Sequence, residues 1–258
     1  MPSPSDLAEC LQLQREEVET LEAIYTSEVV SSTFDPSASA PEVGGLPSSP
    51  SYTATVTVIM HIDFAEGSGG QPRMVRLVRR PSPSPESAAE ASGGSSPSAS
   101  ATSTSSTFSL SHLPPLTLTI AYPPSYPSHS PPVLLSATTP PSSPYLDPTI
   151  LTSTLPELLA STYEVSAPDA CLWTFLELVR TGEFLSLGRD GADAGDVLEV
   201  CTVEESEDGL KRVRRQLEAW DRGMRGEGFE RTTFGCGICL EERKGKRCLE
   251  LGGCGHVL

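Results

Sequence analysis

Four side chains near the end of the 258-residue chain have the types and the spacing of zinc ligands. Cys236 and Cys239 form a C-x2-C pair, whose tight turn lets two thiolates converge on one tetrahedral ion. Fourteen residues separate this pair from a second one, Cys254 and His256. Thiolates and imidazoles are the usual ligands of structural zinc sites. The sequence therefore predicts zinc as a cofactor and these four residues as its ligands.

Two other readings of these cysteines stay open at this point. A lone C-x2-C pair also occurs in redox sites, and the thiols could be reduced side chains without a metal. The second Cys/His pair at this spacing favours zinc. Four of the seven cysteines lie between Cys236 and Cys254, and such crowding favours a metal over disulfides in a reducing compartment. Cys248 lies six residues before Cys254 and is not expected to be a primary ligand.

Composition and charge exclude several classes of partner. The net charge is −16, whereas nucleic acids and anionic membranes are bound by basic surfaces, so we expect neither as the main partner. The N-terminal MPSPSDLAEC lacks the features of a secretory signal, and no apolar run is long enough to span a bilayer. We expect a soluble protein of the cytoplasm, the nucleus or both. Frequent proline (24) and glycine (21) indicate a folded core diluted by loops.

The first half of the chain predicts one helix and several strands. Residues 7–29 carry the apolar stripe of an amphipathic helix, and the Ser/Pro/Gly-rich stretch 31–51 predicts a loop. The alternation in SYTATVTVIMHIDF, residues 51–64, predicts a strand, with RMVRLVRR, residues 73–80, as its hairpin partner. Residues 81–107 are almost entirely Ser, Pro, Ala, Thr and Gly, which predicts a disordered insertion.

The second half adds two strands and two helices. Strand character returns at residues 116–122 and again at residues 132–137. Asp147 has the position of the N-cap of a first helix. A second helix follows Pro168 and ends near Gly182. A helix, three or four antiparallel strands and then helices make an α+β fold, with a sheet covered by helices on one face.

A proline-rich crossover connects two of the apolar strands. AYPPSYPSHSPPVLL, residues 121–135, holds five prolines. Each proline fixes its own φ angle and biases the preceding residue toward extended backbone. The run therefore predicts a stiff connection outside the strand ladder, with Tyr122 and Tyr126 available to pack beneath it.

This crossover, the helix LQREEVETLEAIY and the two later helices together resemble the RWD domain family over residues 7–183. The resemblance implies the fold of ubiquitin-conjugating enzymes, normally without their active site, and binding of protein partners. An active conjugating enzyme needs a thiol nucleophile soon after the strand that follows the crossover. No cysteine occurs between Ala137 and Ala170, and Cys171 lies in an apolar helical pattern that predicts a buried structural thiol. We therefore expect no conjugating activity.

Three further parts are predicted beyond the RWD-like region. Residues 184–209 are acidic and loop-like, which predicts a linker, and residues 210–224 carry the narrow apolar stripe of a short helix. Residues 234–258 contain CGICLEERKGKRC and CGHVL. These motifs resemble the start of the first RING in RING-between-RING ubiquitin ligases, of the androgen-receptor-associated type and its fungal relatives.

The RING resemblance assigns a role to each predicted ligand. Cys236 and Cys239 match the first two ligands of a cross-brace, which hold one zinc ion, and Cys254 and His256 match the next two, which hold a second. The chain stops at Leu258, so each ion has two of its four ligands here. A single Cys3His site remains the alternative. The resemblance places the ubiquitin-accepting cysteine of this class in a second RING, and no catalytic residue is assigned in this chain.

Two functions follow as hypotheses. The first is the N-terminal part of a RING-between-RING ubiquitin ligase, whose RING recruits a ubiquitin-conjugating enzyme while the RWD domain recruits a substrate or a regulator. The second is a stand-alone RWD adaptor without catalytic activity. A regulator of translation is a third possibility, but it leaves the cysteine-rich tail without a role.

Overall fold

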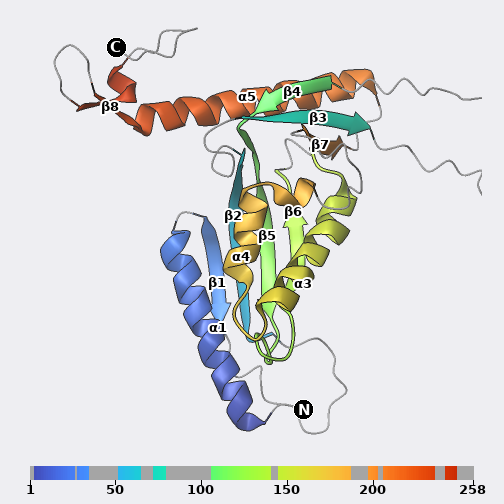
Figure 1. Ribbon diagram of the computed structural model, residues 1–258, viewed down its shortest axis with the longest axis vertical. Helices are drawn as coiled ribbons and strands as arrows, with labels where there is room; N and C mark the ends of the chain where they lie inside the picture. Colours follow the sequence, from blue (N-terminus) through green and yellow to red (C-terminus); the bar gives the residue numbers. More distant parts are fainter. Residues whose placement is uncertain are drawn as a thin grey trace, which may run out of the picture.

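The computed structural model describes nine segments of the chain (Figure 1), which are residues 3–26, 28–34, 52–64, 72–79, 106–140, 145–186, 197–202, 206–235 and 242–248. Residues 81–105 of the predicted insertion lie outside these segments, and residues 106 and 107 begin a strand. Within the described segments, no helix combines the length and the apolar character that crossing a membrane requires.

The core of the fold is an antiparallel sheet with the strand order β1-β2-β5-β6. Its strands are β1 (Val29–Phe34), β2 (Ala54–Asp63), β5 (His112–Tyr122) and β6 (Val133–Thr138). In β2, alternate side chains such as Val56, Val58 and Met60 are buried, as the sequence alternation predicts for a strand with one face on a core. The predicted α+β architecture is confirmed.

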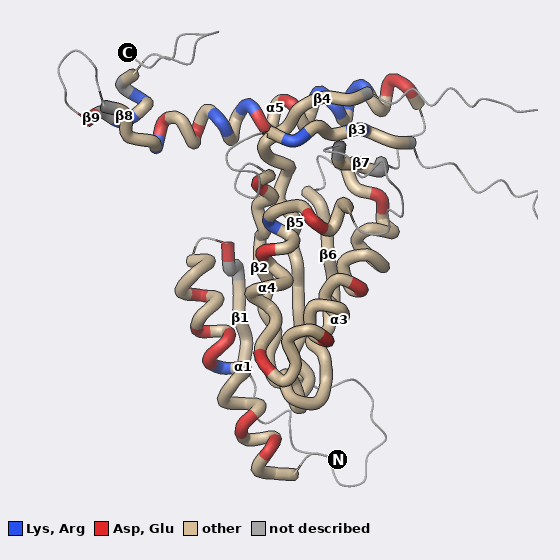
Figure 2. Tube along the Cα trace, viewed as in Figure 1, with Lys and Arg blue, Asp and Glu red and all other residues tan. Residues whose placement is uncertain are grey.

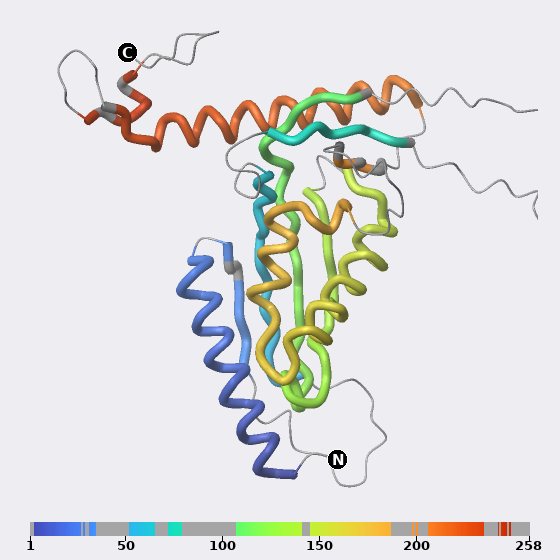
Figure 3. The backbone as a smooth tube through the Cα atoms, in the orientation of Figure 1, coloured from blue at the N-terminus to red at the C-terminus, as the bar shows by residue number. Residues whose placement is uncertain are grey.

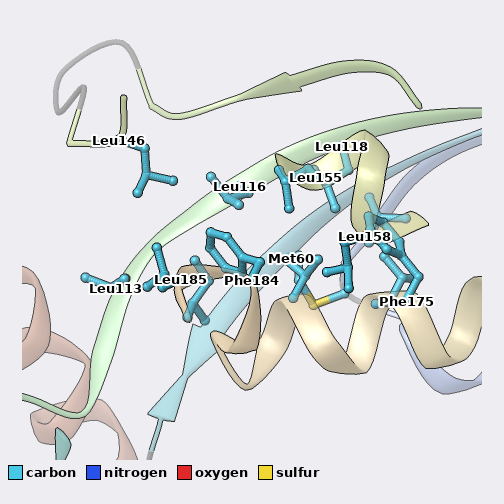
Figure 4. Close-up of a cluster of buried hydrophobic side chains, with 14 of the residues drawn as sticks. Met60, Leu113, Leu116, Leu118, Leu146, Leu155, Leu158, Phe175, Phe184 and Leu185 are labelled. Carbon is cyan, nitrogen blue, oxygen red and sulfur yellow. The ribbon is translucent and has the colours of Figure 1, made fainter. Parts of the chain in front are cut away.

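Helices pack on one face of this sheet (Figure 3), namely α1 (Pro4–Ile24), α3 (Leu155–Ser166) and α4 (Leu172–Arg180). Figure 4 shows how Met60 and Leu116 from the strands approach Leu155, Leu158 and Phe175 from the helices. All five side chains are buried. Burying an apolar side chain of this size contributes about 1.5–3 kcal/mol, so this layer holds the fold together.

The N-terminal elements differ from the sequence prediction at both ends of the first helix. The helix starts at Pro4, earlier than residue 7, because Ser3 and Asp6 form a capping box: Ser3 Oγ accepts from the Asp6 N–H at 3.2 Å. It ends at Ile24, and Val29–Phe34 forms β1 on the edge of the sheet, in place of the loop expected from residue 31. The sequence VVSSTF lacks the apolar alternation that marks a half-buried strand, so this edge strand gave no signal.

A second sheet, with the order β4-β3-β7, corrects two further predictions. It contains β3 (Arg73–Arg79), β4 (Ser106–Leu110) and β7 (Val197–Thr202). β3 pairs with β4 and runs parallel to β7, so the predicted hairpin between β2 and β3 is wrong. β7 lies inside the predicted linker 184–209, where Leu198 and Val200 are buried. The strand VLEVCT is only six residues long and lies within an acidic stretch, whose composition indicated a linker.

A long helix, α5 (Glu207–Arg231), lies along the second sheet, and its C-terminal part extends beyond it (Figure 1). The predicted short helix 210–224 is therefore too short at both ends. Ser206 Oγ caps the start by accepting from the Gly209 N–H at 3.0 Å. The prediction ended early because α5 has no buried residue after Asp221, so no helical periodicity marks its last ten residues.

The helical segment after Asp147 begins as predicted. Asp147 Oδ1 accepts from the Thr149 N–H at 2.7 Å. The next turns form a π-helix, η2 (Ile150–Thr154), which leads directly into α3. α4 ends before Gly182, which has a left-handed φ of 75° and precedes the short 3-10 helix η3 (Glu183–Leu185).

Candidate functional site

The predicted ligands Cys236 and Cys239 follow directly on a short strand. β8 (Thr233–Gly235) pairs antiparallel with β9 (Glu242–Lys244), and Gly235 pairs with Glu242 at the end of the ladder. The two cysteines fall in the connection between these strands. This hairpin brings together the chain on either side of the C-x2-C pair, which favours the convergence of two thiolates on one ion.

All four predicted zinc ligands lie outside the described residues, so their mutual geometry stays a prediction. The chemistry of the donor set fits zinc, because three thiols and one imidazole are ligands that a borderline-soft divalent ion prefers. In the part of the chain that the structure describes, no group of three or more His, Cys, Asp or Glu side chains is arranged to hold a metal ion.

The β8–β9 hairpin is fixed to the C-terminal end of α5. The ring centroids of Phe229 and Phe234 lie 5.0 Å apart. Gly245, the first residue of η4 (Gly245–Arg247), donates its N–H to the Thr232 carbonyl at 2.8 Å. A Cβ atom at position 245 would lie 1.9 Å from the Phe229 carbonyl oxygen, so only glycine fits there. The hairpin is therefore docked on the end of the helix.

A buried carboxylate holds the other half of α5 to the sheets. The Asp221 side chain is 1% exposed, and its Oδ1 accepts the N–H groups of Ser111 and His112, both at 2.9 Å. Ser111 is the bend between β4 and β5. His112 Nδ1 lies 3.2 Å from the same oxygen, and Arg225 contacts Oδ2 at 2.7 Å. One side chain thus joins the helix to the point where the two sheets meet.

Hydrogen bonding keeps Asp221 ionised in this position. Burial raises its pKa, but the hydrogen bonds from His112 and Ser111 and the charge of Arg225 outweigh burial. The pKa of Asp221 therefore lies below the ordinary value of 3.8.

The sequence analysis missed Asp221, although the helix pattern contains a signal for it. The apolar stripe of α5 consists of Leu210, Val213 and Leu217, all of them buried. Asp221 lies four positions after Leu217 and so continues the same face of the helix. An acidic residue that continues an apolar stripe is the pattern expected of a buried carboxylate with partners on another element.

The proline-rich crossover packs as predicted. Tyr122 and Tyr126 are fully buried and stack with ring centroids 4.7 Å apart. Gln14, a polar residue within the apolar stripe of α1, donates from Nε2 to the carbonyls of Pro123 at 2.9 Å and Tyr126 at 2.7 Å. These carbonyls lie outside the strand ladder, so the amide of Gln14 satisfies them and ties α1 to the crossover.

A second buried carboxylate, Glu17 of α1, joins the crossover to α4. Glu17 accepts from the Tyr126 hydroxyl at 2.9 Å and from the Leu172 N–H at 2.8 Å. The same hydroxyl accepts from the Cys171 N–H at 2.9 Å. Burial raises the pKa of Glu17 above its ordinary value of 4.5, although the Leu172 and Tyr126 hydrogen bonds act in the opposite direction.

The thiols of Cys10 and Cys171 are not in the environment of a nucleophile. Both side chains are fully buried. Burial raises the pKa of Cys171 to about 11, so the thiol stays protonated at neutral pH. Cys171 is therefore a structural thiol, as the sequence predicts, and neither residue is placed to accept ubiquitin.

The corner between α3 and α4 exposes apolar side chains. Val165 is 88% exposed and Trp173 is 51% exposed. The residues between them that are also exposed include Ala167, Pro168 and Ala170. The sequence analysis did not single out Trp173, although the buried stripe of α4 leaves position 173 on the outer side of the helix.

Acidic residues lie on α3 and in its connection to α4, near this apolar corner (Figure 2). Glu164 and Asp169 are exposed within it. Arg180 is the one basic residue in the segment 145–186, and it pairs with Glu177. The corner is therefore an apolar surface with an acidic rim. Basic residues instead gather on α5 and β3, in the other layer of the molecule.

Comparison with known proteins gives one finding. The family model described as RWD domain matches residues 12–181, which lie within the range 7–183 of the sequence resemblance. Neither a curated protein nor a solved structure matches the chain. The matched residues contain most of α1, the central sheet, the crossover, α3 and α4, and RWD domains are protein-interaction modules of ubiquitin-related proteins. The chain belongs to the RWD domain family.

Proposed function

We propose that the chain is the partner-recruiting module of a RING-between-RING ubiquitin ligase. Its RWD domain would hold a substrate or a regulator, and the first RING would recruit a charged ubiquitin-conjugating enzyme. Cys236, Cys239, Cys254 and His256 would supply zinc ligands to that RING. The zinc would act structurally, because ions held by thiolates and imidazole stabilise the fold of small domains that have little core of their own.

One observation carries this proposal, which is the docking of the β8–β9 hairpin on α5. The hairpin brackets Cys236 and Cys239, and the ring contact of Phe229 with Phe234 attaches it to the helix. Asp221 in turn attaches α5 to the RWD domain. The region that would bind a conjugating enzyme is thereby connected to the region that would bind a partner.

The apolar corner of α3 and α4 is the surface that we assign to the partner. An exposed tryptophan is a frequent anchor of protein interfaces, because it buries a large area at a low cost in side-chain entropy. Glu164 and Asp169 beside it favour a basic rim on the other protein. We therefore propose a protein partner with an apolar pocket for Trp173 and with lysine or arginine around that pocket.

Ubiquitin discharge from a charged conjugating enzyme, with the full-length protein, tests both parts of the proposal. The wild type is expected to accelerate discharge, and Cys239→Ala is expected to abolish the acceleration. Trp173→Ala should leave this discharge unchanged but weaken binding of the purified partner by about 30-fold or more. The partner is identified beforehand by photocrosslinking from position 174 and is then titrated directly.

Thr174→Ala serves as the matched control, because Thr174 is an exposed neighbour outside the apolar set. Partner affinity that is equal in Trp173→Ala and the wild type would refute the binding surface. Discharge by Cys239→Ala at the wild-type rate would refute the ligase part. Partner binding that depends on Trp173, with no discharge by the wild type, would instead establish the stand-alone adaptor.

A further inference from the structure

Three glycines lie in the part of α5 that has no buried residue. Gly223, Gly226 and Gly228 follow the last buried position, Asp221, and precede Phe229, which contacts the β8–β9 hairpin. Figure 1 shows this part of α5 projecting beyond β3 and β4 toward β8. We call residues 222–228 the free segment of α5.

The structure around these glycines does not require glycine. A Cβ atom at any of the three positions would meet nothing within 4 Å. At Gly182, by contrast, the backbone is left-handed with a φ of 75°, and at Gly245 a Cβ would collide with the Phe229 carbonyl. Positive φ and close packing thus explain glycine at 182 and 245 but not in the free segment.

Glycine instead weakens the helix locally. Each glycine lowers the equilibrium constant for the helical state about 5-fold relative to alanine, so three of them amount to a factor on the order of 100. The free segment gains little compensation from packing, because its residues other than half-buried Met224 are exposed. The exposed ion pair of Glu227 with Arg231 at 3.3 Å contributes about 0.3–0.5 kcal/mol. Arg225 pairs at 2.7 Å with buried Asp221, so this contact lies at the docked end of the segment.

Both ends of the free segment are anchored. On one side, Leu217 is buried against the core and Asp221 accepts two backbone N–H groups. On the other side, the Phe229 ring contacts the Phe234 ring and the Thr232 carbonyl accepts the Gly245 N–H. Any unwinding is therefore confined between two firm attachments.

We propose that residues 222–228 are a hinge between the RWD domain and the β8–β9 hairpin. Transient unwinding of this segment changes the orientation of the hairpin relative to the RWD domain while leaving both intact. The inference rests on the geometry and composition of α5 and does not depend on zinc binding or on ligase activity.

Hydrogen exchange on the full chain tests the hinge. In the wild type, amides of residues 224–231 are expected to exchange about 100-fold faster than those of residues 213–220. The triple variant Gly223→Ala, Gly226→Ala, Gly228→Ala should slow exchange in the free segment about 100-fold and leave the docked part unchanged. Equal wild-type rates in the two parts of α5 would overturn the proposal.

A distance measurement separates a hinge from a contact surface. Spin labels on keto amino acids at exposed Thr20 and Lys246 leave the native cysteines untouched. The distance distribution should be broad in the wild type and narrow in the triple alanine variant. Ala219→Gly, in the docked part of α5, is the matched control and should not broaden it. If the triple alanine variant keeps the wild-type distance distribution but loses partner binding, the glycines form a contact surface for a partner. This result also overturns the hinge.

Discussion

Replacing Asp221 with alanine is expected to lower the free energy of unfolding by about 3 kcal/mol. The variant leaves the N–H groups of Ser111 and His112 without their acceptor, and each buried unsatisfied donor costs about 1–3 kcal/mol. Urea denaturation followed by circular dichroism measures the loss. Hydrogen exchange at the same two amides should accelerate, because α5 no longer covers them.

Asp221→Asn is the matched control for this prediction. Its amide oxygen can still accept from both N–H groups, so the loss should be about 1 kcal/mol, mainly from the missing charge opposite His112 and exposed Arg225. A loss below about 0.5 kcal/mol in the alanine variant would contradict the role that we assign to Asp221, since surface substitutions fall in that range.

The stabilisation by Asp221 is expected to depend on pH in a defined direction. Its pKa in the folded protein lies below the ordinary value of 3.8. A carboxyl with a depressed pKa stabilises the folded state above its unfolded-state pKa, and this contribution is lost as the pH falls toward the folded-state pKa. The wild type should therefore exceed Asp221→Asn in free energy of unfolding by the full amount at about pH 7. This difference should shrink below about pH 3.8.

Tyr126→Phe is the second substitution with a large expected effect, a loss of about 3 kcal/mol in the free energy of unfolding. The ring and its stacking on Tyr122 remain, so the change isolates the hydroxyl. Without it, the Cys171 N–H loses its acceptor and buried Glu17 loses a donor. A buried group left without its hydrogen-bond partner costs about 1–3 kcal/mol, and this substitution leaves two such groups.

Tyr145→Phe provides the matched control, because the buried Tyr145 hydroxyl makes a single neutral hydrogen bond to the Pro114 carbonyl at 2.6 Å. Its removal should cost about 1 kcal/mol. Equal losses for the two tyrosines in thermal or urea unfolding would refute the special position of Tyr126.

Glu17 adds a pH dependence to the Tyr126 prediction. Burial holds the pKa of Glu17 above 4.5 in the folded protein, so the folded state binds the proton more tightly than the unfolded chain. Stability contributed by this group is therefore lost as the pH rises from 4.5 through the raised pKa. Tyr126→Phe should steepen this loss by removing a donor to the carboxylate, and Glu17→Gln should abolish it.

Local patterns in the sequence predicted the elements that bury a regular apolar face. β2 alternates strictly, and α4 repeats Leu172, Phe175, Leu176 and Val179 at helical spacing, so this strand and this helix were predictable. The proline-rich crossover was predictable for a different reason, because proline restricts the backbone wherever it occurs.

The missed elements depend on partners that are distant in the sequence. β7 becomes a strand through parallel pairing with β3, more than a hundred residues earlier. Its own sequence, VLEVCT, is short and lies within an acidic stretch. Asp221 likewise acquires its role from Ser111 and His112. From the neighbouring sequence alone, Asp221 is recognised only as a polar position on an apolar helix face. Its partners cannot be identified in this way.

Of the two candidate sites, one was predictable from local sequence and the other required the fold. Zinc ligands are recognised by spacing, which is a local property of the sequence, so Cys236, Cys239, Cys254 and His256 could be proposed at once. The apolar corner around Trp173 required the fold, because exposure depends on how α3 and α4 turn their buried faces toward the sheet.

Native mass spectrometry of the full-length protein, purified with zinc present, tests the central claim most directly. The wild type is expected to retain zinc, and Cys239→Ala should retain fewer zinc ions per chain while the unfolding transition of the RWD domain stays unchanged. Cys248→Ser, which alters a half-buried thiol outside the predicted ligand set, should retain the wild-type zinc content. A wild type without zinc, or equal zinc loss in both variants, would contradict the zinc-bound RING and with it the proposed ligase function.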